Sequence, residues 1–90
     1  MAIIIANHKV KDFKFWKPYY DGDISRRKSF GLKDLVVGTK ADDPGEVYMI
    51  WETKDPEKAK KMSQDPDLEA RMKEAGVTSE LHITVVNNGG

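Results

Sequence analysis

The chain has 90 residues, the length of one domain with a modest hydrophobic core, and we expect a single domain ordered from about residue 3 to residue 86. It has no cysteine, which excludes disulfides and thiolate metal sites. Its 15 basic and 15 acidic side chains cancel, whereas nucleic-acid-binding domains usually carry a basic excess. The longest apolar run, Ile3–Ala6, is far too short to span a bilayer. We therefore expect a cytoplasmic protein that binds neither nucleic acid nor membrane.

The first predicted strand covers Ile3–Val10, and a helical pattern follows it from an N-cap at Asp12 to a stop at Gly31. Asp21-Gly22-Asp23 interrupts this pattern. Since glycine costs about 1 kcal/mol in a helix interior, we expect a kink or a break there, with a strained backbone at Gly22. Arg26-Arg27-Lys28 falls in the last turns, where a solvated cationic helix end is the common explanation. The apolar face of the helix consists of Phe13, Trp16, Tyr20 and Ile24.

Two strands are predicted next, over Leu32–Ala41 and Glu46–Thr53, joined by a turn at residues 42–45. Asp55-Pro56 and Asp65-Pro66 each place an N-cap before a proline at the first helical position. Two short helices, or one helix broken at Pro66, are therefore expected before a stop at Gly76. The last strand covers Leu81–Val86, and residues 87–90 are expected to fray.

This order of elements predicts an α+β domain of the ferredoxin-like βαββαβ type, with helices on one face of an antiparallel sheet. Right-handed crossovers give the strand order 4-1-3-2. The other face of the sheet would be bare, yet Tyr48 and Ile50 are apolar in one phase of the third strand while Val47, Met49 and Trp51 are apolar in the other. An apolar face of that size does not stay in water, so we expect a homodimer. A tolerant edge strand partly covered by the tail is the alternative.

Short motifs spread over nearly the whole chain resemble the dimeric α/β-barrel superfamily. The chain is most similar to small, largely uncharacterised proteins related to antibiotic-biosynthesis monooxygenase-like domains. The resemblance implies a dimeric ferredoxin-like fold, but the superfamily includes cofactor-free oxygenases, cyclases, haem-handling proteins and stress-related proteins, so the fold does not select a function. The motifs are His8-Lys9-Val10-Lys11-Asp12-Phe13 leading to Trp16, Gly31-Leu32, Asp42-Asp43-Pro44-Gly45-Glu46-Val47, Trp51-Glu52 and Asp65-Pro66.

One position departs from the pattern of the superfamily. Many monooxygenase-like members carry a histidine on the second helical segment, four residues before a proline, and counting back from Pro66 this position is Met62. A thioether neither takes up a proton at neutral pH nor binds haem iron as an imidazole does. The departure argues against the best-known oxygenase chemistry and leaves room for a site on other strands.

His8 and His82 are the only histidines, and they lie in the first and last predicted strands, which should be antiparallel neighbours. If Ile4 lies opposite Val86, His8 lies opposite His82, and both share a face with Glu80 that points into the dimer interior. These three side chains are the candidate catalytic residues, as an acid/base group. A weak metal site is a less favoured alternative, and two isolated surface histidines are the plain one. The opposite face, which would seat the helices, carries Ile3, Ile5, Leu81, Ile83 and Val85.

Trp16 and Tyr20 could line a ligand pocket between helix and sheet, together with Trp51 and Met62, although this spacing is also typical of a plain core. The expected ligand is a small, mostly apolar metabolite, aromatic or polyketide-like. The expected chemistry is cofactor-free oxygenation or a proton-transfer rearrangement, with no cofactor and no metal. The alternative is a non-enzymatic ligand-binding or stress-related interaction protein, and haem handling is a third possibility.

Overall fold

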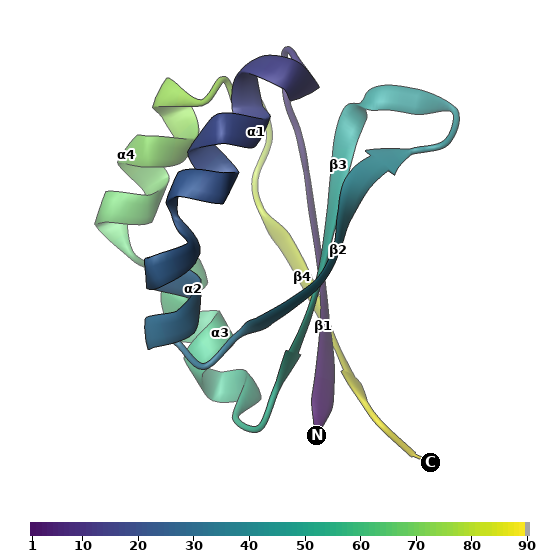
Figure 1. The fold of residues 1–90 in the computed structure, drawn as a ribbon, viewed down its shortest axis with the longest axis vertical. Helices are drawn as coiled ribbons and strands as arrows, with labels where there is room; N and C mark the ends of the chain where they lie inside the picture. The colour runs from purple at the N-terminus through teal and green to yellow at the C-terminus, as the bar shows by residue number, and fades with distance from the viewer. Residues whose placement is uncertain (90) are drawn as a thin grey trace.

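The computed structural model describes residues 1–89, and all four helices lie on one side of a single four-stranded sheet (Figure 1). The predicted α+β class and βαββαβ order are confirmed, with each helical crossover formed by two short helices. The elements are β1 (Ala2–Lys9), α1 (Phe13–Gly22), α2 (Ile24–Ser29), β2 (Lys33–Lys40), β3 (Asp43–Thr53), α3 (Pro56–Ser63), α4 (Pro66–Glu74) and β4 (His82–Asn87).

The sheet has the strand order β2-β3-β1-β4, which confirms the predicted 4-1-3-2 arrangement. All pairs are antiparallel, and β1 lies in the interior between β3 and β4. Ile4 of β1 lies opposite Trp51 on one side and Val85 on the other. Residues that lie directly opposite one another share a face of the sheet, so this register decides which side chains meet the helices.

Strand β2 contains one extra residue relative to its partner. Asp34 lies opposite Trp51 and Val36 lies opposite Ile50, so Leu35 is the bulged residue. The bulge turns Asp34 toward the helices and Val36 away from them. The hairpin to β3 is tighter than predicted, because Lys40 already pairs with Asp43 and the turn is limited to residues 41–42.

The first crossover breaks at the predicted place. Asp23 ends α1 by donating its backbone N–H to the carbonyl of Tyr20 (3.1 Å), and α2 starts at the next residue. Gly22 has no positive φ, since only Gly31 and Gly76 among the described residues do, so the expected backbone strain at Gly22 is wrong. Gly31 and Gly76 each end a helix, as predicted.

The second crossover consists of the two short helices expected from its Asp-Pro pairs. Asp55 and Asp65 cap α3 and α4 by accepting backbone N–H groups of Glu57 (3.2 Å) and Asp67 (2.9 Å). No helix in the described part of the chain is long and apolar enough to cross a membrane. The predicted fraying is wrong for Asn87, which pairs with Ala2, and for Asn88, whose backbone N–H donates to the carbonyl of Met1 (3.3 Å); residue 90 lies outside the described residues.

The inner face of the sheet meets the helices and forms the core. Ile4, Ala6 and His8 of β1 point inward, while Ile3 and Ile5 point outward, which is the reverse of the predicted phase for this strand. The pattern of β1 could not decide the phase, since three consecutive isoleucines are apolar in both. The buried core includes Ile4, Ala6, Val47, Met49, Trp51, Ala59 and Met62.

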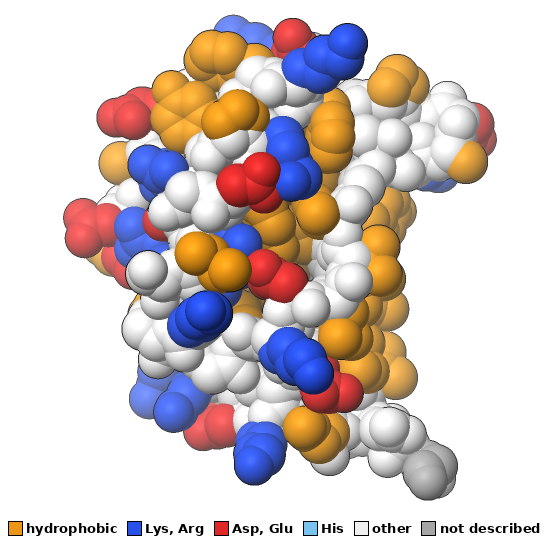
Figure 2. Space-filling view, viewed as in Figure 1, with side chains coloured by type: hydrophobic (Ala, Val, Ile, Leu, Met, Phe, Trp, Pro, Cys, Tyr) orange, Lys and Arg blue, Asp and Glu red, His pale blue; other side chains and the backbone are white. Residues whose placement is uncertain are grey.

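The outer face of the sheet is apolar and has no cover within the described chain. A cross-strand row runs from Ile5 through Ile50 to Val36, and Val36 is 55% exposed. Figure 2 shows hydrophobic side chains gathered along the sheet side of the molecule, with charged side chains over the helices. We call the set Ile3, Ile5, Val36, Ile50 and Val86 the outer apolar face.

Candidate functional site

His8 is the most unusual side chain of the inner face. It is only 3% exposed, and neither of its ring nitrogens has a hydrogen-bond partner among the described residues. Its ring packs edge-on against Trp16, with centroids 5.6 Å apart. Burial disfavours the charged form and lowers the pKa of His8 to about 4. The imidazole is therefore neutral at pH 7, with one donor and one acceptor both unused.

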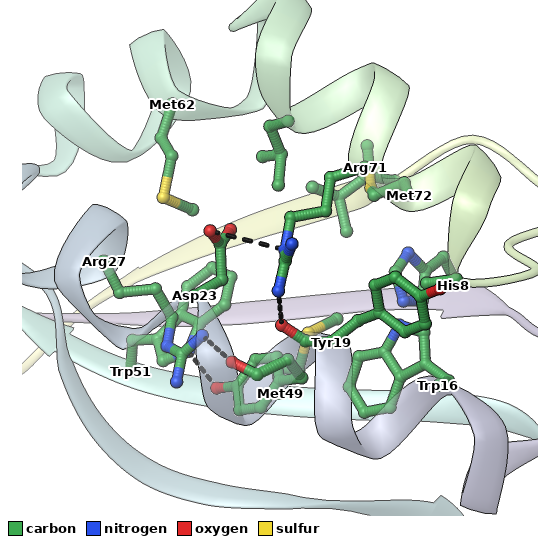
Figure 3. A pocket seen from close by; sticks show the side chains of 14 residues that line it. His8, Trp16, Tyr19, Asp23, Arg27, Met49, Trp51, Met62, Arg71 and Met72 are labelled. Carbon is green, nitrogen blue, oxygen red and sulfur yellow. Dashed lines mark hydrogen bonds and ion pairs between the residues drawn. The ribbon is translucent and has the colours of Figure 1, made fainter.

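A cavity of about 50 Å³ lies beside His8, between the inner face of the sheet and the helices (Figure 3). It has room for a few water-sized groups and is smaller than the roughly 150 Å³ that holds a benzene ring, so a ring-sized ligand has to displace side chains of the wall. Three flexible methionine side chains in its wall, Met49, Met62 and Met72, allow it to adapt. All four predicted ligand-binding residues, namely Trp16, Tyr20, Trp51 and Met62, line this one cavity together with His8 and Arg71. Their binding role itself stays a prediction.

One end of the cavity wall is a buried aromatic and polar network. The ring of Tyr20 stacks on Trp16, with centroids 5.0 Å apart. The indole N–H of Trp51 donates to the Tyr20 hydroxyl (2.8 Å), and that hydroxyl donates to Asp34 (3.4 Å). Burial raises the pKa of Tyr20, so its hydroxyl stays protonated at neutral pH. This network fixes the aromatic wall in place.

Arg27 belongs to this network and is not the solvated helix end that its sequence position suggests. It is 4% exposed and donates two hydrogen bonds to Asp34, at 2.8 and 3.0 Å. A third bond runs to the carbonyl of Tyr20 (2.6 Å), and the guanidinium lies 3.7 Å from the centre of the Tyr20 ring. Arg27 is thus fully engaged in holding α2 against the sheet.

Arg71 of α4 also lines the cavity and was not predicted as a site residue. Its Nη2 donates to the carbonyl of Tyr19 (3.0 Å), and its Nε lies 3.5 Å from the carboxylate of Asp23 (Figure 3). A Cβ at Gly22 would come within 3.0 Å of Arg71 Nη2. The glycine in the middle of a helical pattern was therefore the sequence signal that another group lies close to this position.

The predicted grouping of His8 with His82 and Glu80 is wrong. His82 lies opposite Asn7 rather than His8, one residue away from the predicted register, so it is exposed on the outer side of the sheet. Glu80 is exposed before the start of β4 and does not line the cavity of His8. Within the described residues, no three His, Cys, Asp or Glu side chains lie close enough to hold a metal ion, so the metal alternative loses its ligands.

Comparisons with known proteins agree on the fold. No family model matches the sequence, and no curated protein matches it. Among solved structures, an antibiotic biosynthesis monooxygenase matches with a TM-score of 0.66 and 16% identity over all of both chains. A conserved protein from Methanosarcina mazei matches with a TM-score of 0.69 and 15% identity, over 97% of this chain and 91% of the other. A dimeric ferredoxin-like protein from an uncultured marine organism matches with a TM-score of 0.64 and 12% identity, over 100% of this chain and 96% of the other.

The fold is ferredoxin-like. The ferredoxin-like fold that the resemblance implied is thereby confirmed. Since the identities lie between 12% and 16%, the chemistry of this ferredoxin-like chain has to be inferred from its own side chains. The side chains that offer chemistry are the buried His8 and the partly engaged Arg71.

Proposed function

We propose that this chain is a homodimeric protein whose cavity binds a small, mostly apolar metabolite that presents a hydroxyl group to His8. The supporting observation is a buried imidazole beside an apolar cavity, whose two nitrogens have no partner in the described part of the chain. A buried polar group without a partner costs about 1–3 kcal/mol. A ligand that supplies a hydrogen bond recovers this free energy, so the site favours ligands with a donor placed against the imidazole.

The chemistry that suits this site is cofactor-free oxygenation. A neutral imidazole can accept the proton of an enol or phenol, which leaves an electron-rich substrate anion in an apolar, water-poor site. Such an anion reacts with O₂, and an activated methylene becomes a carbonyl that keeps one oxygen atom while the other leaves as water. A solved antibiotic biosynthesis monooxygenase of the same fold supports this assignment.

A non-enzymatic ligand-binding role is the second candidate, and one observation favours it. A pKa of about 4 makes His8 a weak base at pH 7, well below the optimum for a general base. The imidazole would then serve only to orient the ligand through a hydrogen bond. The two candidates share the binding site and differ only in turnover.

The homodimer is the second part of the proposal. The outer apolar face has no cover in the described chain, and such a face in water marks an interface. A solved structure of the same fold is a dimeric ferredoxin-like protein. A second copy placed face to face on the sheet would cover Ile5, Ile50 and Val36 in both protomers, as stacked sheets do.

The binding proposal is tested with phenol and toluene, which have similar rings and differ in the hydroxyl group. The indole N–H signals of Trp16 and Trp51 report binding by NMR, because both side chains line the cavity. Phenol should bind about fivefold or more tightly than toluene, as one recovered hydrogen bond implies. His8→Phe should remove the difference, whereas His82→Gln, which alters the exposed histidine, should keep it.

Turnover is tested separately with anthrone, which carries an activated methylene, by following O₂ uptake in air-saturated buffer. Uptake that depends on His8 supports the oxygenase. Ligand binding without uptake leaves the non-enzymatic role. Failure of both phenol and toluene to shift either indole signal contradicts the proposed cavity function altogether.

A further inference from the structure

Arg71 has unused hydrogen-bonding capacity at the cavity wall. Of its five N–H donors, one makes a hydrogen bond among the described residues, the 3.0 Å bond from Nη2 to Tyr19. Nε is buried and makes no hydrogen bond within residues 1–89, and its ion pair with Asp23 is long, at 3.5 Å. A guanidinium in this state can still bind a planar anion through two parallel hydrogen bonds.

The partner of Arg71 is held mainly by another cation. Asp23 makes its short ion pair with Arg26 (2.9 Å), and Arg26 also pairs with Asp65 (2.7 Å). Asp23 can therefore release Arg71 and keep a cationic partner. Arg27 lines the same cavity but differs from Arg71. Each of its three guanidinium nitrogens already donates a hydrogen bond to Asp34 or to the carbonyl of Tyr20.

The backbone around Arg71 is arranged to admit its guanidinium. The break after α1 diverts the N–H of Asp23 to Tyr20, so the carbonyl of Tyr19 is free to accept from Arg71. The missing side chain at Gly22 provides the space, since a Cβ there would lie 3.0 Å from Nη2. Figure 3 shows the guanidinium between Asp23 and Tyr19, facing the aromatic side of the cavity.

We infer that the ligand of this cavity is a small aromatic or unsaturated carboxylic acid, whose carboxylate takes the place of Asp23 on Arg71. The inference rests on the proposed function, because it assigns the chemical class of the ligand in the same site. A carboxylate fits the size of the group already facing Nε, and the apolar wall of methionines and aromatic rings suits the remainder of the molecule. Arg71 is then the residue that determines specificity.

The test compares benzoate with benzamide, which has the same ring and size without the charge, by the indole N–H shifts of Trp16 and Trp51. Benzoate should bind about tenfold more tightly than benzamide, as expected for a charge-assisted pair. Arg71→Gln should abolish this preference and Arg71→Lys should keep part of it. Lys73→Gln removes one exposed cation from the same helix and should leave the preference unchanged.

Asp23→Asn should raise the affinity for benzoate, whereas Arg71→Gln lowers it. A gain in affinity cannot come from a loss of folding, so this variant tests ligand recognition by itself. The Asp23 side chain makes no capping hydrogen bond at the start of α2, and asparagine keeps an oxygen that can accept from Arg26, while it no longer carries the charge that competes for Arg71. Benzoate affinity should rise about two- to fivefold in this variant. Equal binding of benzoate and benzamide to the unmodified protein, or a preference for benzoate that survives Arg71→Gln, overturns the acid inference. If phenol binds in such a case, the cavity function stands; if phenol, benzoate and benzamide all fail to bind, the cavity function falls first.

Discussion

The two faces of the sheet differ in what each leaves unsatisfied. The inner face is covered by four helices, and its apolar residues are buried, yet it contains a histidine that has no hydrogen-bond partner in the part of the chain that the structure describes. Among the described residues, the outer face has no unsatisfied polar group of this kind, and its apolar side chains are left partly in water. One face lacks a polar partner and the other lacks an apolar cover.

This difference separates two kinds of association. A polar group in a small cavity is satisfied by a small molecule, whereas a row of apolar side chains across four strands is satisfied by a surface of similar size. Binding of the small molecule depends on one hydrogen bond, and association of the two sheets depends on the apolar surface area that they bury. Changes to the two faces should therefore produce independent effects on ligand binding and on assembly.

The largest effect is expected from a charge on the outer face. Ile50→Lys places an ammonium in the middle of the outer apolar face, and an unpaired buried charge should cost about 3–5 kcal/mol of association free energy. Light scattering at micromolar concentration should show a dimer for the unmodified protein and a monomer for this variant. Ile24→Lys, at an exposed apolar residue of α2, is the matched control and should remain dimeric. A folded species of about 10.2 kDa for the unmodified protein contradicts the dimer.

The second effect is a pH dependence that originates from the inner face. In the unfolded chain His8 takes up a proton below its ordinary pKa of 6.5, while in the folded chain it does so only near 4. The unfolded state therefore binds more protons between these values, and stability falls as the pH is lowered through this window. The free energy of unfolding should decrease by about 3 kcal/mol from this group, measured by urea titration at pH 7 and pH 4.

The two histidines allow this contribution to be isolated. Carboxylates also titrate in this range, so the quantity of interest is the difference between the unmodified protein and His8→Phe at each pH. His82→Gln should keep the full pH dependence, since His82 lies on the other face and is exposed. An identical pH dependence in His8→Phe would show that folding does not lower the pKa of His8.

The smallest effect is expected at the junction of α1 and α2. Gly22→Ala gains up to about 1 kcal/mol of helix propensity, because the backbone there is open to any residue. The new methyl group displaces the guanidinium of Arg71, 3.0 Å away, and weakens its bond to Tyr19. The net change in unfolding free energy should be within about 1 kcal/mol, and a double-mutant cycle with Arg71→Gln should show a coupling of about 1 kcal/mol. Additive effects would mean that the two positions do not interact.

Local signals in the sequence were sufficient to predict most of the fold. Asp-Pro pairs marked the starts of α3 and α4, Gly31 and Gly76 marked helix ends, and the order of elements gave the sheet topology. These features depend on neighbouring residues, whose chemistry is visible in the sequence. The aromatic residues of the cavity were predicted for the same reason, since helical spacing placed Trp16 and Tyr20 on one face.

The candidate site was predicted less well because it depends on contacts between distant segments. A register shift of one residue between β1 and β4 separated His8 from His82, and three isoleucines in a row gave no means of choosing the register. Arg71 reaches Tyr19 across 52 positions of the chain, a contact that no local pattern encodes. The one sign of this contact in the sequence was Gly22, whose missing side chain leaves space for the Arg71 guanidinium.

The bulge at Leu35 determines which side chains of β2 face the helices, and so whether Asp34 reaches Arg27 at the cavity wall. If the same residues paired regularly, with Val36 opposite Ile50 and no bulge, Leu35 would lie beside Trp51 and Asp34 would point to the outer face. Arg27 would then be a buried cation without its carboxylate. Removal of Leu35 itself would keep Asp34 opposite Trp51 and Val36 opposite Ile50 in regular pairing, so we expect Asp34 and Arg27 to be inherited together among homologues of this chain, with or without the extra residue.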